Sequence, residues 1–483
     1  MIFSRDIALI FAAAGMLSGC AGNPKSAFDG VEKSVARASG KQVHWLRSGQ
    51  EQADAQRAVQ AMLRRPLNAD SAAQIALLNN KSLQSRFEQL GIGFADYVEA
   101  SLPSNPSFAA SVRFPSKPPS GTNIEYSIAQ DLLSLLLLPI KRNLAARELE
   151  ITRLQIAGDV LGLVAETKAA FYTLQARQQL LGRLQLIVQT NEAGADLAKG
   201  QHDAGNITDL DLANQQALYS QSRVEVGQTQ AEIRSDRERL NRLLGAWGAQ
   251  TNWTVAGELP AIPSSEISLA RLESKAIAQR VDLAAVRQEV ASLGLAMSLK
   301  QKTRFVPGGV NVGVDTERDP DRQRVTGPTL DLQLPIFNFG QAALLRLRSQ
   351  LAQAQRDLEA MSVNARSEVR EARDLIAANR ELAAYYRKVL LPQRLLIVNQ
   401  TQLQYNAMQL GPIDLLTAKE RELNAERTYI DTWRDYWIAR TELERAMHGG
   451  SGGGMQSMQR ETKMRSMQMR GGESRMNTSS SSN

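Results

Sequence analysis

The residue of this chain with the most definite chemistry is Cys20, the only cysteine among 483 residues. It follows Leu17-Ser18-Gly19, and these four residues have the form of a bacterial lipobox, in which the cysteine receives acyl chains on its thiol and amino group. Arg5 and the apolar stretch 7–16 precede it, as in a secretory signal. Ala21, rather than Asp, agrees with sorting to the outer membrane. The sequence therefore predicts a lipid anchor at Cys20; the alternative is an ordinary signal peptide with a cysteine near its cleavage site by chance.

No spacing of side chains in the sequence is typical of a catalytic centre. His44, His202 and His448 lie in unrelated segments, and none has a second His or Cys at metal-ligand spacing. The glycine run 449–454 lacks the Lys and the strand-to-helix context of a phosphate-binding loop. We therefore expect neither enzyme activity nor a cofactor.

The last 35 residues carry the one unusual group of possible metal ligands. Thioether sulfur favours Cu(I) and similar soft ions, and short Met–Met spacings occur among Gly, Ser, Gln and Arg. The weak candidate ligands are Met455, Met458, Met467 and Met469. A solvated tail without ligand duty explains the composition equally simply, and it is the favoured interpretation.

Composition and charge limit the class of protein. The formal net charge is +7, but basic residues are scattered among acidic ones along helical patterns, so no nucleic-acid partner is expected. Low aromatic content with abundant Ala, Leu, Gln, Arg and Glu favours extended helices. No run of eighteen or more apolar residues follows the signal, so strands are the elements expected to cross a membrane if the chain spans one.

The chain contains one module twice. Leu138-Pro139-Ile140 recurs as Leu334-Pro335-Ile336, at an offset of 196, each at the end of a strand-like segment. The segment 205–212 corresponds to 408–415, and Leu240 to Leu443, both at an offset of 203. The difference of seven residues equals one heptad, which a packed helix tolerates because its apolar stripe stays on nearly the same side.

Each module predicts a long helical hairpin. The long helices 142–199 and 340–409 would reach about 85 and 105 Å at 1.5 Å per residue. After a short break each is followed by a returning helix, at 209–244 and 412–447. A further helical pair precedes each strand region, at 72–100 and 269–300, and the connector 245–265 is rich in Gly, Pro and Trp.

Four strands are predicted between these helices by alternation of apolar and polar residues. They run from Phe108 to Phe114, from Ile124 to Ile128, from Val310 to Val314 and from Leu330 to Leu334. The connections 115–122 and 316–326 are polar, as loops facing water would be. The strands are either transmembrane or part of a small soluble sheet that helices cover. Since four strands cannot close a pore in lipid, a transmembrane sheet would require several chains.

These motifs, in this order, resemble those of the TolC family of outer-membrane factors from about Pro66 to His448. The segments that carry the resemblance are Ala76-Leu77-Leu78-Asn79-Asn80, Leu102-Pro103-Ser104-Asn105-Pro106, Gly327-Pro328, Leu334 to Gly340, and Tyr405 to Leu416. The resemblance implies a mainly α fold with a transmembrane β part. Long antiparallel hairpins form an α-barrel, and four strands per chain contribute to a twelve-stranded β-barrel in a homotrimer.

The resemblance also implies a gate and partners at the hairpin tips. The gate residues would be Leu410 with Asp414 and, in the first module, Ile207 with Asp211; both aspartates also fit simple helix capping. A periplasmic adaptor protein, bound to an inner-membrane pump, would contact the residues Gly205, Asn206, Gly411 and Pro412. One departure from the family pattern is Met408, which occupies the position of Gly205 in the second tip.

The predicted organisation comprises a signal peptide (1–19), a lipidated segment (20–65), two repeats (66–265 and 266–448) and a tail (449–483). The expected function is a passive, lipid-anchored outer-membrane conduit with a long periplasmic extension, exporting drug-like molecules or metal ions. A type I protein secretion conduit and a non-conducting structural or adaptor-type periplasmic lipoprotein remain alternatives.

Overall fold

The computed structural model describes residues 24–114, 116–117, 121–263, 271–306 and 309–450. The chain divides into two compact units. The first comprises residues 1–33, 85–156 and 283–362, and the second comprises residues 34–84, 157–282 and 363–483. Within the described residues, no helix combines the length and the apolar character needed to cross a bilayer.

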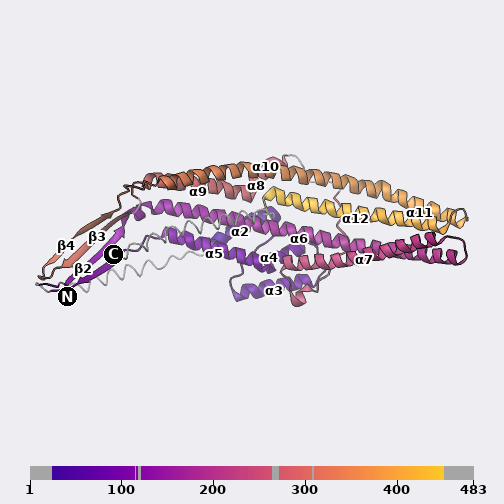
Figure 1. Cartoon of the computed structure of the whole chain (residues 1–483), viewed down its shortest axis with the longest axis horizontal. Coiled ribbons are helices and arrows are strands. Elements are labelled where there is room, and N and C mark those ends of the chain that lie inside the picture. The colour runs from indigo at the N-terminus through magenta and orange to yellow at the C-terminus, as the bar shows by residue number, and fades with distance from the viewer. Residues whose placement is uncertain (1–23, 115, 118–120, 264–270, 307–308, 451–483) are drawn as a thin grey trace. The chain divides into compact units, whose positions relative to one another are not determined.

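The first unit contains one antiparallel sheet of four strands in the order β1-β2-β3-β4 (Figure 1). The strands are β1 (Ser107–Arg113), β2 (Asn123–Asp131), β3 (Val310–Arg318) and β4 (Arg324–Leu332). β1 pairs with β2 and β3 with β4 as hairpins, and the two hairpins are joined by the β2–β3 pairing. The four predicted strands are therefore confirmed and form a single sheet, but β1 ends at Arg113 rather than Phe114, and β4 ends at Leu332 rather than Leu334.

The strand register gives this sheet one apolar and one polar face. Phe108 lies opposite Ile128, Ile128 opposite Val314, and Val314 opposite Pro328, so these residues share a face across all four strands. Phe108 and Leu330 on this face are 65 % and 63 % exposed. We call it the apolar sheet face; its other large exposed members are Val112, Tyr126, Ile128, Val312, Val314 and Leu332. Within the described residues these side chains are therefore left exposed.

Both strands of the second hairpin are longer than the sequence indicated. The polar segment 316–326 was expected to be a loop, but pairing continues to Arg318 and Arg324 and leaves only residues 319–323 as the turn. In the turn Asp319 N–H donates to the Gln323 carbonyl at 2.9 Å. Thr316, Glu317 and Thr326 are polar on both faces, so alternation could not reveal these strand ends.

The two repeats differ where each leaves the sheet. Leu138-Pro139-Ile140 lies inside α6 (Leu132–Asp203), rather than at a strand end, whereas Leu334-Pro335-Ile336 precedes α10 (Gln341–Tyr385) in a non-helical segment. The leucine-rich start of α6 has high helix propensity, while Gly340 adopts φ +73° before α10. The expected motif equivalence was therefore wrong in structural terms.

This difference changes the interpretation of the seven-residue offset. Asp131 and Leu332, the last residues of β2 and β4, are 201 positions apart, close to the offset of 203 at the tips. No heptad insertion is needed. The second long helix continues from α10 through a π-helical segment, η2 (Tyr386–Leu390), into α11 (Leu391–Asn406). The i→i+5 bonds of η2 take up an extra residue just before Pro392, which lacks an N–H donor.

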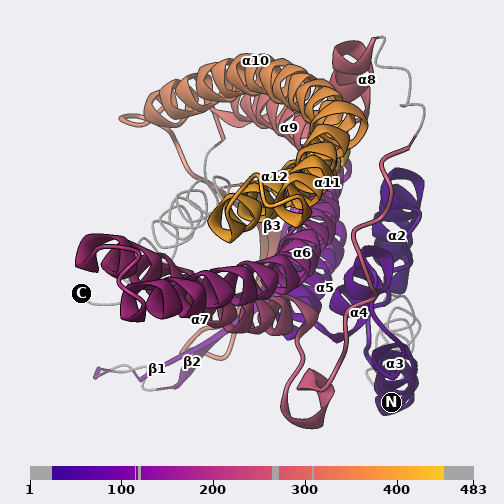
Figure 2. The same cartoon turned by 90° about the vertical axis from the view of Figure 1, so that its right-hand side faces the viewer.

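At 72 residues α6 is about 108 Å long. It returns as α7 (Asp209–Leu244), and α11 returns as α12 (Pro412–His448); both hairpin ends are seen in Figure 2. The predicted helical pairs are α4 (Ala69–Asn79) with α5 (Lys81–Ser101), and α8 (Leu272–Gln279) with α9 (Val281–Thr303). α2 (Lys25–Ser39), α3 (Gly49–Leu63) and the 3-10 turn η1 (Gly248–Thr251) were not predicted.

The main core of the second unit surrounds α6. Phe171 and Leu174 of α6 pack with Ile75 of α4, Leu240 of α7 and Trp253 of the connector, and all five are buried. Trp253 Nε1 donates to the Asn241 side chain at 2.9 Å. Burial of such aromatic and aliphatic side chains is the principal stabilising contribution here.

Candidate functional site

The turns at the two hairpin tips are built in the same way. Gly205 and Met408 both have left-handed backbone, with φ of 75° and 58°. Gly205 N–H donates to the His202 carbonyl, and Met408 N–H to the Tyr405 carbonyl, at 2.8 and 2.9 Å. A side chain with a Cβ is strained in this conformation, so Met408 stands where glycine would be relaxed. Its side chain is 95 % exposed.

Asp211 caps the start of α7. Its carboxylate accepts hydrogen bonds from the Thr208 hydroxyl at 2.7 Å and from the Thr208 N–H at 3.2 Å, and Thr208 in turn accepts from the Asp211 N–H. The Thr208 hydroxyl and then the Thr208 backbone hold the pKa of the Asp211 carboxyl below its usual range. Beside it, Asp209 contacts His202 Nε2 at 2.6 Å, a pairing that the sequence analysis missed.

Asp414 has the equivalent place at the start of α12. Its Oδ2 accepts the Gly411 N–H at 3.1 Å, and Pro412 occupies the first helical position. Both aspartates are exposed, while Ile207 and Leu410 beside them are half-buried. The structure therefore assigns capping to both carboxylates and brings each predicted gate pair together on its own tip. A gating role stays a prediction.

The predicted adaptor-contact residues lie at the same two turns. Gly205, Asn206 and Gly411 are exposed, and Pro412 is half-buried. They form accessible tip surfaces, and contact with an adaptor stays a prediction.

Ion pairs and an apolar cluster connect the two hairpins within the second unit. Arg183 of α6 pairs with Glu426 of α12 at 3.1 Å, and Arg427 of α12 pairs with Glu225 of α7. Leu423 of α12 packs against residues of α6, namely Leu180, Leu184 and Ile187. Sequence reasoning missed these links because each joins residues about 200 or more positions apart.

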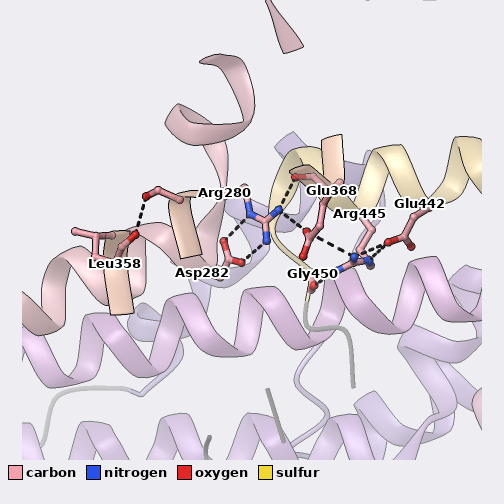
Figure 3. Close-up of polar contacts among 9 residues, drawn as sticks. Arg280, Asp282, Leu358, Glu368, Glu442, Arg445 and Gly450 are labelled. Carbon is pink, nitrogen blue, oxygen red and sulfur yellow. Dashed lines mark hydrogen bonds and ion pairs between the residues drawn. The ribbon is translucent and has the colours of Figure 1, made fainter. Parts of the chain in front are cut away.

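A buried cluster of charges anchors the end of α12 (Figure 3). Arg280, between α8 and α9, donates two hydrogen bonds to Asp282 at 3.0 and 2.7 Å, and both side chains are 4 % exposed. It also donates to Glu368 of α10 at 2.7 Å and to the Ala446 carbonyl at 3.0 Å. Burial alone would lower the pKa of Arg280, but the hydrogen bonds and charges of Asp282 and Glu368 raise it.

The first repeat uses amides at the matching place. Asn80, between α4 and α5, donates to the Leu243 carbonyl at 2.9 Å. Leu243 and Ala446 are 203 positions apart, so Asn80 and Arg280 hold equivalent carbonyls. Each returning helix then ends in a left-handed glycine, Gly245 or Gly449, whose added Cβ would meet the Asn79 carbonyl or the Asp282 carboxylate within 3 Å.

Several large apolar side chains of α10 and α11 are exposed among the residues that the structure describes. Leu375 and Leu382 of α10, and Leu396 and Leu403 of α11, are about half exposed, and each pair has heptad spacing. In α6 only the first of the four equivalent positions, Tyr172, is buried. Helices with such uncovered heptad residues pack against further helices.

Some predicted residues lie outside the described part of the chain. These are the lipidation residue Cys20 and the weak metal candidates Met455, Met458, Met467 and Met469. Among the described residues no group of three or more His, Cys, Asp or Glu is arranged to hold a metal ion.

Comparison with solved structures identifies the fold. A membrane protein from Pseudomonas aeruginosa has a TM-score of 0.67 at 19 % identity, over 81 % of this chain and 91 % of that one. The Campylobacter jejuni CmeC outer membrane channel has a TM-score of 0.63 at 14 % identity, over 89 % of this chain and 95 % of that one. CusC, whose crystal structures are described in connection with folding and transmembrane channel formation, has a TM-score of 0.64 at 16 % identity, over 79 % of this chain and 92 % of that one. No family model and no curated protein matches the sequence.

These likenesses show that the chain has the fold of outer-membrane channel proteins, as its resemblance to the TolC family implied. The compared structures are described as channels or membrane proteins.

Proposed function

We propose that this chain is the outer-membrane channel subunit of an export system, a passive conduit through which an inner-membrane pump drives drug-like molecules or metal ions. The observation that carries this proposal is the apolar sheet face, which continues across all four strands and whose large side chains are exposed within the described part of the chain. Hydrocarbon is the environment that such a face requires, because in water it would promote association. A small soluble sheet would bury this face.

The opposite face of the sheet is suited to line a pore. It carries five acidic side chains, Glu125, Asp131, Asp315, Glu317 and Asp331, and one basic side chain, Arg113. Arg113 is already paired with Glu125 at 2.9 Å. A lumen lined in this way attracts cations more than anions.

The open edges of the sheet support the homotrimer that the resemblance to the TolC family implies. β1 and β4 are the outer strands, and an unpaired strand edge in lipid leaves backbone groups unsatisfied at several kcal/mol each. Three chains would close a twelve-stranded sheet, within the range of known transmembrane sheets. The uncovered heptad leucines of α10 and α11 would pack against helices of the neighbouring copy.

The remaining assignments follow this arrangement. Cys20 would anchor each subunit in the outer membrane through its acyl chains. The tips with Ile207, Asp211, Leu410 and Asp414 would form the periplasmic constriction. Their turns would present Gly205, Asn206, Gly411 and Pro412 to a periplasmic adaptor protein.

Two adjacent residues of β4 provide the test. Leu330 lies on the apolar face and Thr329 on the polar face. Leu330→Cys and Thr329→Cys would each be labelled with a polarity-sensitive fluorophore and reconstituted in phosphatidylcholine vesicles, with the labelled parent as background. Spin-labelled acyl chains should quench the Leu330 site, and aqueous iodide the Thr329 site. Equal quenching of both sites by iodide would contradict a membrane-spanning sheet, and planar-bilayer conductance would then test the pore itself.

A further inference from the structure

The apolar sheet face changes character along the β3–β4 hairpin. From the helix end toward the turn, successive opposed pairs on this face are Val310–Leu332, Val312–Leu330, Val314–Pro328, Thr316–Thr326 and Arg318–Arg324. Three apolar pairs are therefore followed by a hydroxyl pair, with Oγ1 atoms 3.2 Å apart, and then by a cationic pair. This order matches the sequence of environments from hydrocarbon through the ester region to the phosphates of a lipid leaflet.

Arg318 and Arg324 are directly opposed across the hairpin and both are exposed. Like charges at directly opposed positions of a sheet destabilise the pairing. Within the described part of the chain, neither guanidinium forms an ion pair or a hydrogen bond. The hairpin thus places two positive charges side by side, on the same face as the valines and leucines.

A third arginine lies in the turn between them. Arg322 has φ +73°, a left-handed conformation in which Gly or Asn is far less strained. Its N–H closes the turn by donating to the Asp319 carbonyl at 2.8 Å. Arg322 thus adds a third basic residue to a hairpin end that also holds the acidic residues Glu317, Asp319 and Asp321. Among the residues of the four strands, the charges on the apolar sheet face are those of Arg318 and Arg324.

We infer that Arg318 and Arg324 bind the phosphate groups of a phosphorylated lipid in the outer leaflet. This inference rests on the proposed function, because it requires the apolar sheet face to contact acyl chains. Guanidinium groups bind phosphate through paired, charge-assisted hydrogen bonds, and phosphate removes the repulsion between the arginines. A lipid is favoured over a soluble anion because the arginines continue the acyl-facing surface.

The depth of the arginines agrees with this occupant. Eight residues separate Val310 from Arg318, about 26 Å along a strand, or about 20 Å of depth at the strand tilt of about 40° usual in membranes. Exposed Phe337 and Phe339 follow β4 at its other end, as in the aromatic girdles at membrane boundaries. The span between the girdle and the arginines therefore fits an apolar band of about 25 Å.

Arg113 provides a matched control. It belongs to the same end of the sheet, but it lies on the polar face and pairs with Glu125. Arg318→Gln with Arg324→Gln removes the cationic pair and its repulsion, so the double variant should fold. Arg318→Lys with Arg324→Lys keeps both charges and serves as the second variant.

The experiment measures binding of diphosphoryl lipid A to full-length protein in detergent, by native mass spectrometry and by titration. The Gln double variant should bind about 30-fold more weakly than the parent, since two basic residues near the headgroups are lost. Arg113→Gln should bind like the parent, the Lys double variant should retain most of the affinity, and dephosphorylated lipid A should not distinguish the proteins.

Three results would overturn the inference: parent-like binding by the Gln double variant, an equal loss in Arg113→Gln, or displacement of the lipid by millimolar inorganic phosphate. Acyl-chain quenching of the labelled Leu330→Cys protein in phosphatidylcholine vesicles is measured in parallel. If that quenching persists while lipid A discrimination is absent, the lipid site fails and the membrane-spanning sheet stands. If quenching itself is absent, the proposed function fails.

Discussion

Removing the Arg280 side chain should loosen the end of α12 far more than the matching change in the first repeat. Arg280→Ala takes the guanidinium from Asp282, a buried carboxylate, and from the Ala446 carbonyl. Breaking one side of a buried ion pair costs about 3–5 kcal/mol, because the partner charge stays buried. Glu368 is 34 % exposed, so water can solvate it and it adds little to this cost.

Asn80→Ala is the matched change. It removes one hydrogen bond to the Leu243 carbonyl and the bond that Asn80 Oδ1 accepts from the Leu83 N–H at 3.1 Å. Loss of such neutral bonds costs about 1–3 kcal/mol and leaves no buried charge. The second repeat should therefore be more sensitive than the first by about 2 kcal/mol, or roughly 30-fold in a local opening equilibrium.

Hydrogen–deuterium exchange of the last turns of α7 and α12 measures both openings in the assembled protein without requiring reversible unfolding. Arg280→Ala should accelerate exchange in residues 441–448, and Asn80→Ala should accelerate it less in residues 238–244. A neutral replacement of the pair, Arg280→Met with Asp282→Leu, should restore most of the protection. If Arg280→Ala changes exchange no more than Asn80→Ala does, the buried ion pair does not hold this helix end.

Three further predictions concern the tips and the first unit. Leu410→Ala with Asp414→Ala should raise planar-bilayer conductance, and Asp414→Glu is the control because it keeps a carboxylate near the start of α12. Loss of the helix cap costs about 1 kcal/mol. Unchanged conductance in a folded trimer would mean that these residues act only at the helix end and not as a gate. Met408→Gly should slow amide exchange at the second tip by relieving about 1 kcal/mol of backbone strain, and reduced export by that variant would assign the exposed side chain to a partner. Burial, together with the carboxylates of Glu148 and Asp357, raises the pKa of Glu289 in the folded protein. A carboxyl group with a raised folded pKa contributes stability at low pH, and this contribution is lost as the pH rises through that pKa. Glu289→Gln should therefore raise the apparent Tm at pH 8 but not at pH 4, and an equal gain at both pH values would refute the electrostatic cause.

Local patterns were sufficient to predict the hairpins and the tips. Thr208 and Asp211 are three residues apart, so their mutual capping follows from sequence spacing alone, and the structure shows those hydrogen bonds. The Arg280 cluster could not be predicted in this way. Its partners Glu368 and Ala446 are 88 and 166 positions away, and only packing of α8, α10 and α12 brings them together.

The start of α6 shows a different limit. Leu138-Pro139-Ile140 and Leu334-Pro335-Ile336 are identical tripeptides, yet one is helical and the other is not. Pro139 is the eighth residue of α6, an interior position where proline removes a backbone hydrogen bond, so the flanking residues and not the tripeptide decide the conformation. The leucines of 132–138 continue a helix directly from the strand, whereas Phe337-Asn338-Phe339-Gly340 delays it.

The sheet could be predicted in part. The face on which each side chain lies follows from odd or even position along the strand, whereas the order of the strands does not follow from the sequence. Side chains alternate strictly along a strand, so the requirement that Val312 and Leu330 share a face allows only registers that differ by two residues. Any such register also places Arg318 and Arg324 on that face. What the sequence could not provide was the length of the pairing, since the polar residues near the turn allowed either strand or loop. Pairing through Arg318–Arg324 turns two scattered basic residues into one cationic end of an apolar surface, and this is why the lipid inference depends on the structure.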